Sequence, residues 1–102
     1  MSDELRVTVL GSGSWGLTLG ILLGENGHRV TMWEFNTELA EELRATRESK
    51  RFLPGVRLPE SIPVETDLSS ALAGADVVLF VVPSHAVRET AMAAARVFDF
   101  KN

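Results

Sequence analysis

Residues 5–34 read LRVTVLGSGSWGLTLGILLGENGHRVTMWE, and two short apolar runs in this stretch flank a longer segment of different periodicity. The runs at residues 5–10 and 29–34 are rich in β-branched and aromatic side chains, which predicts two strands. Between them, over residues 14–26, apolar side chains recur at helical spacing, and Gly27 is placed to end that helix in a left-handed conformation. The stretch therefore predicts a β-α-β unit.

The alternation of strand and helix continues to the end of the chain. Asn36 or Thr37 can cap a second helix, and a proline-rich loop over residues 51–63 follows it. The remaining expected elements are a short strand at residues 64–66, a helix from Asp67 to Ala73 that Gly74 ends, a strand at residues 77–82, and a helix at residues 85–97 that Ser84 caps. The strand VVLFVV is apolar throughout, which suits burial on both faces of a parallel sheet.

Strands that alternate with helices imply right-handed crossovers and a parallel sheet covered on both sides. The expected fold class is therefore α/β, a Rossmann-type parallel sheet with the element order β-α-β-α-β-α-β-α and the strand order 3-2-1-4. This is an incomplete doubly wound fold that lacks the later strands. The length of 102 residues fits one domain over residues 1–102.

The composition excludes several functions. The chain is 45% hydrophobic and 24% charged, and no apolar run approaches the ~20 residues of a membrane span. Because cysteine is absent and there are two histidines, we expect no disulfide, no thiolate chemistry and no metal site. A net charge of −4 and the lack of tyrosine argue against nucleic acid. Basic residues do gather at residues 44–57, either as a solvated helix end and loop or as an electropositive rim near a phosphate-bearing ligand.

The glycines of GSGSWG at residues 11–16 form a G-x-G-x-x-G pattern that follows a predicted strand and opens a predicted helix. In that context Gly11 permits a sharp turn, Gly13 leaves the space that a pyrophosphate needs, and Gly16 lets the helix pack close to the strand. The unpaired N–H groups at the start of the helix favour an anion. We predict a dinucleotide-binding turn; a turn needed only for packing is the alternative.

Glu34 stands at the end of the second predicted strand, about 20 residues beyond the turn, where a carboxylate holds the adenosine ribose hydroxyls in such folds. Its charge would repel a 2′-phosphate, so it favours NAD over NADP. A solvent-exposed glutamate with no ligand is the alternative. Phe35 could lie against the adenine or serve ordinary packing.

Residues 81–88, VVPSHAVR, follow the fourth predicted strand and so reach the crevice at the carboxyl ends of the strands, where ligands of open α/β sheets bind. Pro83 fixes the exit of the chain, and we expect Ser84 and the N–H groups after it to face the crevice. His85 is interpreted as a surface or capping residue rather than as a general base.

Several segments together resemble the N-terminal domain of NAD(P)-dependent glycerol-3-phosphate dehydrogenase. They are GSGSWG (11–16), NGHRVTMW (26–33), RFLPGVRLP (51–59), TDLSSAL (66–72) and ADVVLFVVPSHAVR (75–88). Many dehydrogenases share the glycine turn, but its combination with Ser-Trp inside it, FLPG..LP and VPSHA.R is far more specific. The resemblance implies reversible hydride transfer between NAD(P)H and dihydroxyacetone phosphate or sn-glycerol 3-phosphate, which serves phospholipid synthesis in the cytoplasm.

The resemblance also implies which residues bind the cofactor. They are Gly11, Ser12, Gly13, Ser14, Trp15 and Gly16 in the turn, Glu34 and Phe35 after the second strand, Phe52 in the LPG segment, and Val82, Pro83, Ser84 and Ala86 after the fourth strand. Family members that accept NADPH often carry arginine or histidine in place of Phe35 and a small neutral residue in place of Glu34, so both positions point to NAD.

No catalytic residue is assigned within the 102 residues. The family's catalytic lysines lie in an A-K-G segment after the next strand and in a helical substrate domain, and Lys101 does not take that role. We therefore expect weak dinucleotide binding without turnover. In a chain that ends at Asn102 the VVLFVV strand becomes a sheet edge, which predicts a homo-oligomer formed through that edge.

Two other functions stay open at this point. The chain could be the NAD-binding domain of a hydroxyacyl-CoA, UDP-sugar or ketopantoate dehydrogenase, although the FLPG and VPSHA segments argue against these. It could also be a non-catalytic module that senses a nucleotide through the same turn.

Overall fold

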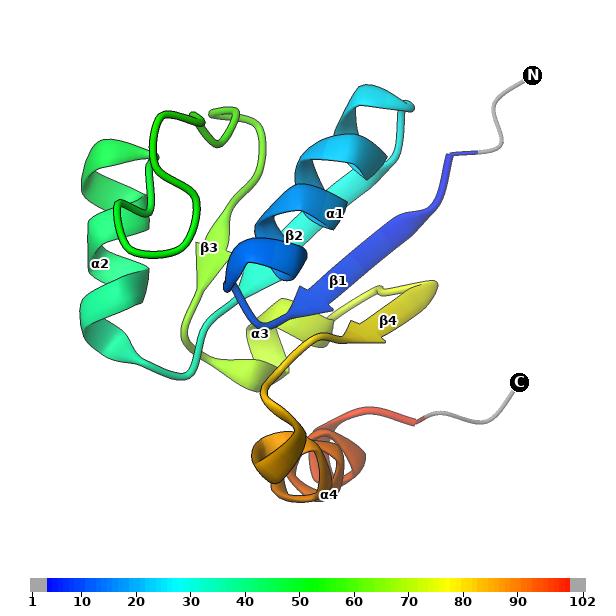
Figure 1. The fold of residues 1–102 in the computed structure, drawn as a ribbon. Coiled ribbons are helices and arrows are strands. Elements are labelled where there is room, and N and C mark those ends of the chain that lie inside the picture. Colours follow the sequence, from blue (N-terminus) through cyan, green and yellow to red (C-terminus); the bar gives the residue numbers. More distant parts are fainter. Residues whose placement is uncertain (1–3, 100–102) are drawn as a thin grey trace.

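The structure of the chain is a computed structural model that describes residues 4–99 (Figure 1). Its strands are β1 (Arg6–Leu10), β2 (Arg29–Trp33), β3 (Val64–Glu65) and β4 (Val77–Phe80). Its helices are α1 (Ser14–Glu25), α2 (Thr37–Thr46), α3 (Leu68–Leu72) and α4 (Val87–Val97), and a 3₁₀ turn, η1 (Ser84–Ala86), precedes α4. Strands and helices alternate as the sequence predicts.

The four strands form one parallel sheet in the order β3-β2-β1-β4, which confirms the expected topology. Val7 of β1 is in register with Val30 of β2 and with Val77 of β4. Since all the strands run the same way, the carboxyl ends of β1, β2 and β4 open on one edge of the sheet, and the glycine turn lies at that edge (Figure 1).

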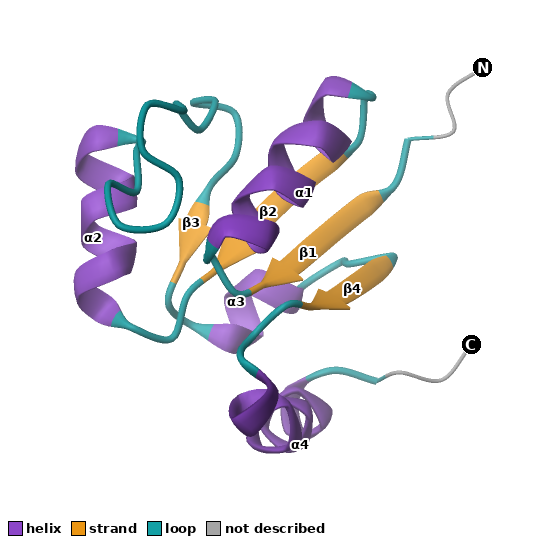
Figure 2. Ribbon diagram, in the orientation of Figure 1, coloured by secondary structure: helices purple, strands orange, loops and turns teal. Residues whose placement is uncertain are grey.

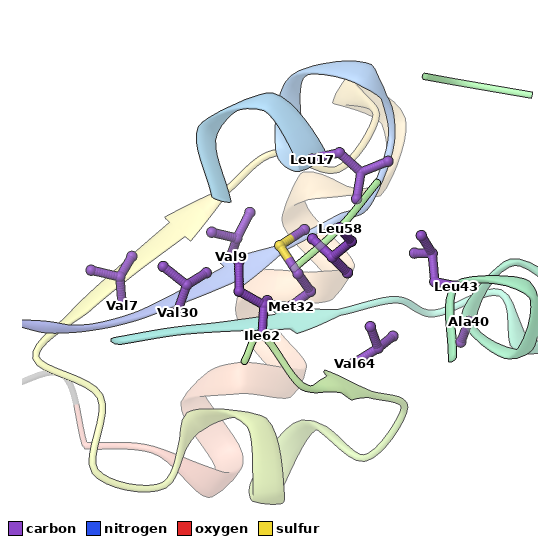
Figure 3. Close-up of a cluster of buried hydrophobic side chains, with 10 residues drawn as sticks. All are labelled: Val7, Val9, Leu17, Val30, Met32, Ala40, Leu43, Leu58, Ile62 and Val64. Carbon is purple, nitrogen blue, oxygen red and sulfur yellow. The ribbon is translucent and has the colours of Figure 1, made fainter. Parts of the chain in front are cut away.

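Helices cover both faces of the sheet, and each face has its own apolar core. Alternate residues of β1 and β2 face α1, α2 and the loop that follows α2. The cluster on this side comprises Val7, Val9, Leu17, Val30, Met32, Ala40, Leu43, Leu58, Ile62 and Val64 (Figure 3). On the other side, Leu10 and Trp33 pack against α3 and α4, with Ala71, Leu72 and Ala94. Figure 2 shows the long loop on the same side as α1 and α2, with α4 on the opposite side.

The expected helix ends form through the residues that the sequence indicates. The Oδ1 atom of Asn36 accepts a hydrogen bond from the Leu39 N–H at 3.1 Å and so caps α2. Asp67 caps α3 in the same way through the Ser70 N–H, at 2.9 Å. Gly27 and Gly74, which follow α1 and α3, have φ values of 91° and 74°, a left-handed region that favours glycine.

The start of the last helix differs from the prediction. Ser84 does not cap a helix that begins at His85, because Ser84–Ala86 form a 3₁₀ turn and α4 begins only at Val87. Pro83 leads into this turn in an extended conformation, and the Ala86 N–H donates to the Pro83 carbonyl at 2.8 Å. The residue before α4 is thus alanine, which has no side-chain oxygen to cap it.

Strand β4 is also shorter and less buried than its sequence suggests. It ends at Phe80 rather than at Val82, although the Val81 N–H still donates to the Leu10 carbonyl at 2.8 Å. Its first three residues are half-buried and Phe80 is exposed. Within residues 4–99, β4 has a neighbouring strand only on the side of β1. Its side chains do pack on both faces of the sheet, Leu79 against one core and Val78 against the other, but none of its four residues is fully buried. None of the helices described in this part of the chain is long and apolar enough to cross a membrane.

Candidate dinucleotide-binding site

Two of the three glycines in the turn between β1 and α1 are required by the fold itself. Gly11 has a φ of 119°, its N–H donates to the Trp33 carbonyl at 2.8 Å, and a Cβ atom here would lie 2.7 Å from the carbonyl oxygen of Val81. A Cβ atom on Gly16 would lie 2.0 Å from the carbonyl oxygen of Gly11. Gly11 therefore makes the sharp turn and Gly16 allows close packing, as the pattern indicates.

Gly13 is different, because packing does not require glycine there. Its φ of −72° and ψ of −169° are accessible to any residue, and a Cβ atom added to it would find no heavy atom within 4 Å. A main chain without a side chain, facing open space, is what the close approach of a ligand's phosphates requires.

The N-terminus of α1 opens on the same space. Gly13 is the N-cap residue and no side chain caps this end, nor does the first turn contain an acidic residue. The first intrahelical bond runs from the Leu17 N–H to the Gly13 carbonyl at 3.0 Å, so the N–H groups before it have no acceptor within the helix. Over the 12 residues of α1 the peptide dipoles add a partial positive charge at this end, which favours an anion.

Glu34 lies beside the turn and is held there by hydrogen bonds from the protein. The backbone N–H and the hydroxyl of Ser12 both donate to its Oε1 atom, at 3.0 and 2.6 Å. The Asn36 N–H donates to Oε2 at 2.9 Å. Ser12 is 1% exposed, so its hydroxyl serves to orient the carboxylate. Glu34 itself is half-buried and is not the freely solvated glutamate of the alternative reading.

The pairing of Ser12 with Glu34 is a feature that the sequence reading missed. The two residues follow β1 and β2, which are neighbours in the sheet with Leu10 in register with Trp33. The predicted strand order was the one feature of the sequence that could have indicated this pair. A strand order that places β1 beside β2 also places the residues that follow the two strands side by side.

Aromatic rings at this edge are largely exposed. Trp15, in the first turn of α1, is 73% exposed, and Phe35 is 82% exposed. The Phe35 ring lies 6.3 Å from that of Trp33 at an interplanar angle of 53°. Phe52 is half-buried beneath the Arg51 guanidinium, which lies 5.0 Å from the ring centroid.

The segments after α2 and after β4 reach the glycine turn by different routes. The Ser14 hydroxyl donates to the Phe52 carbonyl at 2.6 Å, which places the FLPG sequence at the start of α1. The backbone of Val81 and Val82 passes so close to Gly11 that a Cβ atom there would lie 3.0 Å from the Val82 nitrogen.

Beyond this crossing the chain turns toward solvent. Pro83, Ser84 and His85 are exposed, while Val82 and Ala86 are half-buried. Of the N–H groups expected to face the crevice, that of Ala86 is already bonded to Pro83. Among residues 4–99, no group of histidine, cysteine and acidic side chains is arranged to bind a metal ion.

Comparisons with known proteins agree with this geometry. A sequence model of the family described as NAD-dependent glycerol-3-phosphate dehydrogenase N-terminus matches residues 6–101. The glycerol-3-phosphate dehydrogenase [NAD(P)+] of Moorella thermoacetica is 52% identical over 85 residues, which are 83% of this chain and 25% of that protein. The corresponding protein of Chlorobium phaeobacteroides is 48% identical over 86 residues, 84% of this chain and 26% of that protein.

A solved structure gives the same result for the fold. The crystal structure of glycerol-3-phosphate dehydrogenase from Coxiella burnetii superposes with a TM-score of 0.90 at 31% identity, covering 97% of this chain and 30% of that one. The chain thus spans about a quarter of the length of the curated relatives it matches. On the family model, the relatives and the fold together, the chain belongs to the family of NAD-dependent glycerol-3-phosphate dehydrogenase N-terminal domains.

Proposed function

We propose that this chain is the cofactor-binding part of a glycerol-3-phosphate dehydrogenase and that it binds NAD at the carboxyl edge of its sheet. One observation carries the proposal: the bare main chain at Gly13 faces open space directly in front of the uncapped N-terminus of α1. A diphosphate placed there would meet unpaired N–H groups and a partial positive charge, with no acidic side chain in the first turn to repel it.

The carboxylate of Glu34 suits the adenosine ribose of that cofactor. A carboxylate has about four acceptor positions, and the donors from Ser12 and Asn36 use three of them. The remaining position can accept a ribose hydroxyl, whereas a 2′-phosphate at the same place would bring two negative charges together. The site therefore favours NAD over NADP, and the exposed ring of Phe35 offers a flat apolar surface for the adenine.

The bound cofactor supplies the hydride chemistry between glycerol 3-phosphate and dihydroxyacetone phosphate. The residues of this chain bind and orient it. The N-terminus of α1 offsets the diphosphate charge, Glu34 selects the ribose, and the segments at Phe52 and at Val82–Ala86 supply further contacts to the cofactor. None of the described residues is proposed to move a proton on the substrate. We place this activity in phospholipid synthesis in the cytoplasm.

Isothermal titration of the 102-residue chain with NADH and with NADPH tests the proposal. We expect saturable heat with NADH, weaker binding of NADPH, and no oxidation of glycerol 3-phosphate by the chain when it is purified free of host enzyme. No binding of either nucleotide would contradict the proposal, and a preference for NADPH would contradict the role of Glu34. Turnover of glycerol 3-phosphate would show that the chain holds catalytic groups we have not assigned.

We also propose that the chain self-associates through β4. This strand has a neighbour on one side only among residues 4–99, and its apolar residues are half-buried or exposed. Edges of this kind pair with other chains.

A further inference from the structure

The loop between α2 and β3 is tied together by one buried arginine. Arg47 is 8% exposed, and its guanidinium donates to three main-chain carbonyl oxygens across the loop. The Nη2 atom donates to the Pro59 carbonyl at 2.7 Å and to the Ile62 carbonyl, and Nε donates to the Leu58 carbonyl at 3.4 Å. A planar guanidinium can bond several acceptors at once, which a lysine ammonium at the end of a flexible stem does less well.

The backbone at Arg47 also argues for a specific role of its side chain. It has a φ of 61°, and among the described residues other than glycine it alone lies in the left-handed region. Glycine is the usual residue where a helix ends in this conformation. The arginine at the end of α2 therefore has a strained backbone, and the hydrogen bonds of its side chain to the carbonyl oxygens offset that strain.

Residues 48–57, which we name the FLPG loop, are closed at their base by this residue. The Leu58 N–H donates to the Arg47 carbonyl at 2.6 Å, so the chain returns to Arg47 directly after the loop. Inside the loop the Leu53 N–H donates to the Ser49 carbonyl at 2.9 Å, and the Phe52 N–H donates to the Ser49 hydroxyl at 3.2 Å. These bonds make the loop a folded unit with a fixed base.

The tip of the FLPG loop rests on the candidate site. The Phe52 carbonyl accepts the hydrogen bond from the Ser14 hydroxyl at the first residue of α1. Two contacts thus hold the loop: Arg47 binds its base, and Ser14 of α1 binds its tip.

We propose that Arg47 is a positioning residue for the dinucleotide site: by fixing the base of the FLPG loop, it sets where Phe52 lies against the N-terminus of α1. The inference rests on the proposed function, since it concerns affinity for the same cofactor. Arg47 does not touch that site, so its effect passes through the loop.

Binding of NADH to variants of the 102-residue chain tests this. Arg47→Met keeps the aliphatic stem and removes the donors, and we expect about tenfold weaker binding, because the loop must then be ordered when the cofactor binds. Arg47→Gly relieves the left-handed backbone but should bind as weakly as Arg47→Met. Arg47→Lys should recover part of the affinity. Arg57→Met is the matched control, because Arg57 lies in the same loop, is exposed and pairs with Glu60; it should bind as the wild type does.

Two further readouts separate positioning from a general loss of stability. In the absence of ligand, the amides of Phe52 and Leu53 should exchange with solvent faster in Arg47→Met, while that of Gly11 in the turn should not change. In a double-mutant cycle with Ser14→Ala, the losses in affinity should fail to multiply, because both changes release the same loop.

Wild-type affinity in Arg47→Met, or losses that multiply in the cycle, would overturn the inference. If Arg47→Met does not fold, Arg47→Gly decides, because it relieves the left-handed backbone and also removes the donors, and wild-type affinity in that variant has the same meaning. If the wild-type chain binds no NADH, the proposed function fails, and the exchange rates then report separately whether Arg47 holds the loop.

Discussion

At Gly13 and Gly16 the same substitution should have opposite effects. Gly13→Ala places a methyl group in open space on an ordinary backbone, so the free energy of unfolding should stay unchanged or rise by up to about 1 kcal/mol. That methyl group lies where the diphosphate is proposed to approach. Overpacking of about 1–3 kcal/mol would weaken NADH binding about 5- to 150-fold, as measured by isothermal titration.

Gly16→Ala is the matched variant. Its Cβ atom would lie 2.0 Å from a backbone oxygen, and the fold should lose about 3 kcal/mol or more, seen as a lower thermal midpoint. A Gly13→Ala chain that binds NADH as the wild type does would show that the open space is not the diphosphate site.

Glu34→Gln tests the preference for NAD. The substitution keeps an oxygen for the Ser12 donors and removes the negative charge, so the ratio of NADH to NADPH affinity should fall by about tenfold, or 1.4 kcal/mol. Glu38→Gln, an equal change of charge in the first turn of α2, is the control. A ratio that shifts equally in both variants would mean that net charge, not the position of Glu34, sets the preference.

The glycine pattern was sufficient to predict the turn, because Gly11 and Gly16 each have a steric reason that the spacing indicates. Ser12 was harder to interpret. It lies inside the same pattern, but its hydroxyl is directed to Glu34, a residue of the next strand. The residue to which a serine hydroxyl donates depends on the distances between strands. These distances can be inferred from a sequence only through the predicted strand order.

At the scale of a single element, the cap of α3 gives a prediction for pH. Hydrogen bonds from the Ser70 hydroxyl and then from its N–H hold the pKa of Asp67 below its usual value. Since the folded-state pKa is the lower one, the carboxylate stabilises the fold above the pKa of the unfolded chain, about 3.9, and this contribution is lost as the pH falls through the folded-state pKa.

Ser70→Ala removes the hydroxyl and keeps the N–H, so the pKa of Asp67 should rise toward its usual value without reaching it, as followed by NMR titration of the carboxyl carbon. Ser69→Ala, at the neighbouring exposed position, should leave it unchanged. A Ser70→Ala chain with an unaltered Asp67 pKa would mean that the hydroxyl is not the main cause of the shift.

The two elements whose limits differ most from the prediction lie on either side of Pro83. β4 ends at Phe80 and α4 begins at Val87, so the predicted strand and the predicted helix each include residues that lie in the connection between them. Apolar periodicity continues through Val82, but the sheet partner does not: β1 ends at Leu10, and the chain there turns sharply at Gly11. Element limits thus depend on the neighbouring strand, which local sequence does not contain.

For the whole molecule, the strand order follows from the connections. Each pair of strands is joined by a helical segment, and right-handed crossovers leave few arrangements of such units. The burial of β4 does not follow in the same way. VVLFVV has the composition of a central strand, yet among residues 4–99 it has one neighbour, β1, and Phe80 remains 36% exposed. The composition of a strand indicates the surroundings that would suit it. The described residues supply a neighbouring strand on only one of the two edges of β4.

That mismatch predicts self-association of the 102-residue chain. In sedimentation velocity, the mean sedimentation coefficient should rise with protein concentration, because contact between β4 strands of two copies covers their half-buried and exposed apolar side chains. Phe80→Lys puts a charge on the edge and should keep the chain monomeric. Met92→Lys adds the same charge at a 54% exposed apolar position on α4 and should associate as the wild type does.

Circular dichroism of both variants shows whether the fold is retained, so that a monomeric Phe80→Lys chain cannot be attributed to unfolding. If the wild type stays monomeric at every concentration, the proposed self-association is wrong, and an apolar edge strand of four residues is too short to pair with a second copy. If Met92→Lys also abolishes association, the contact runs through α4, and the copies meet face to face rather than edge to edge.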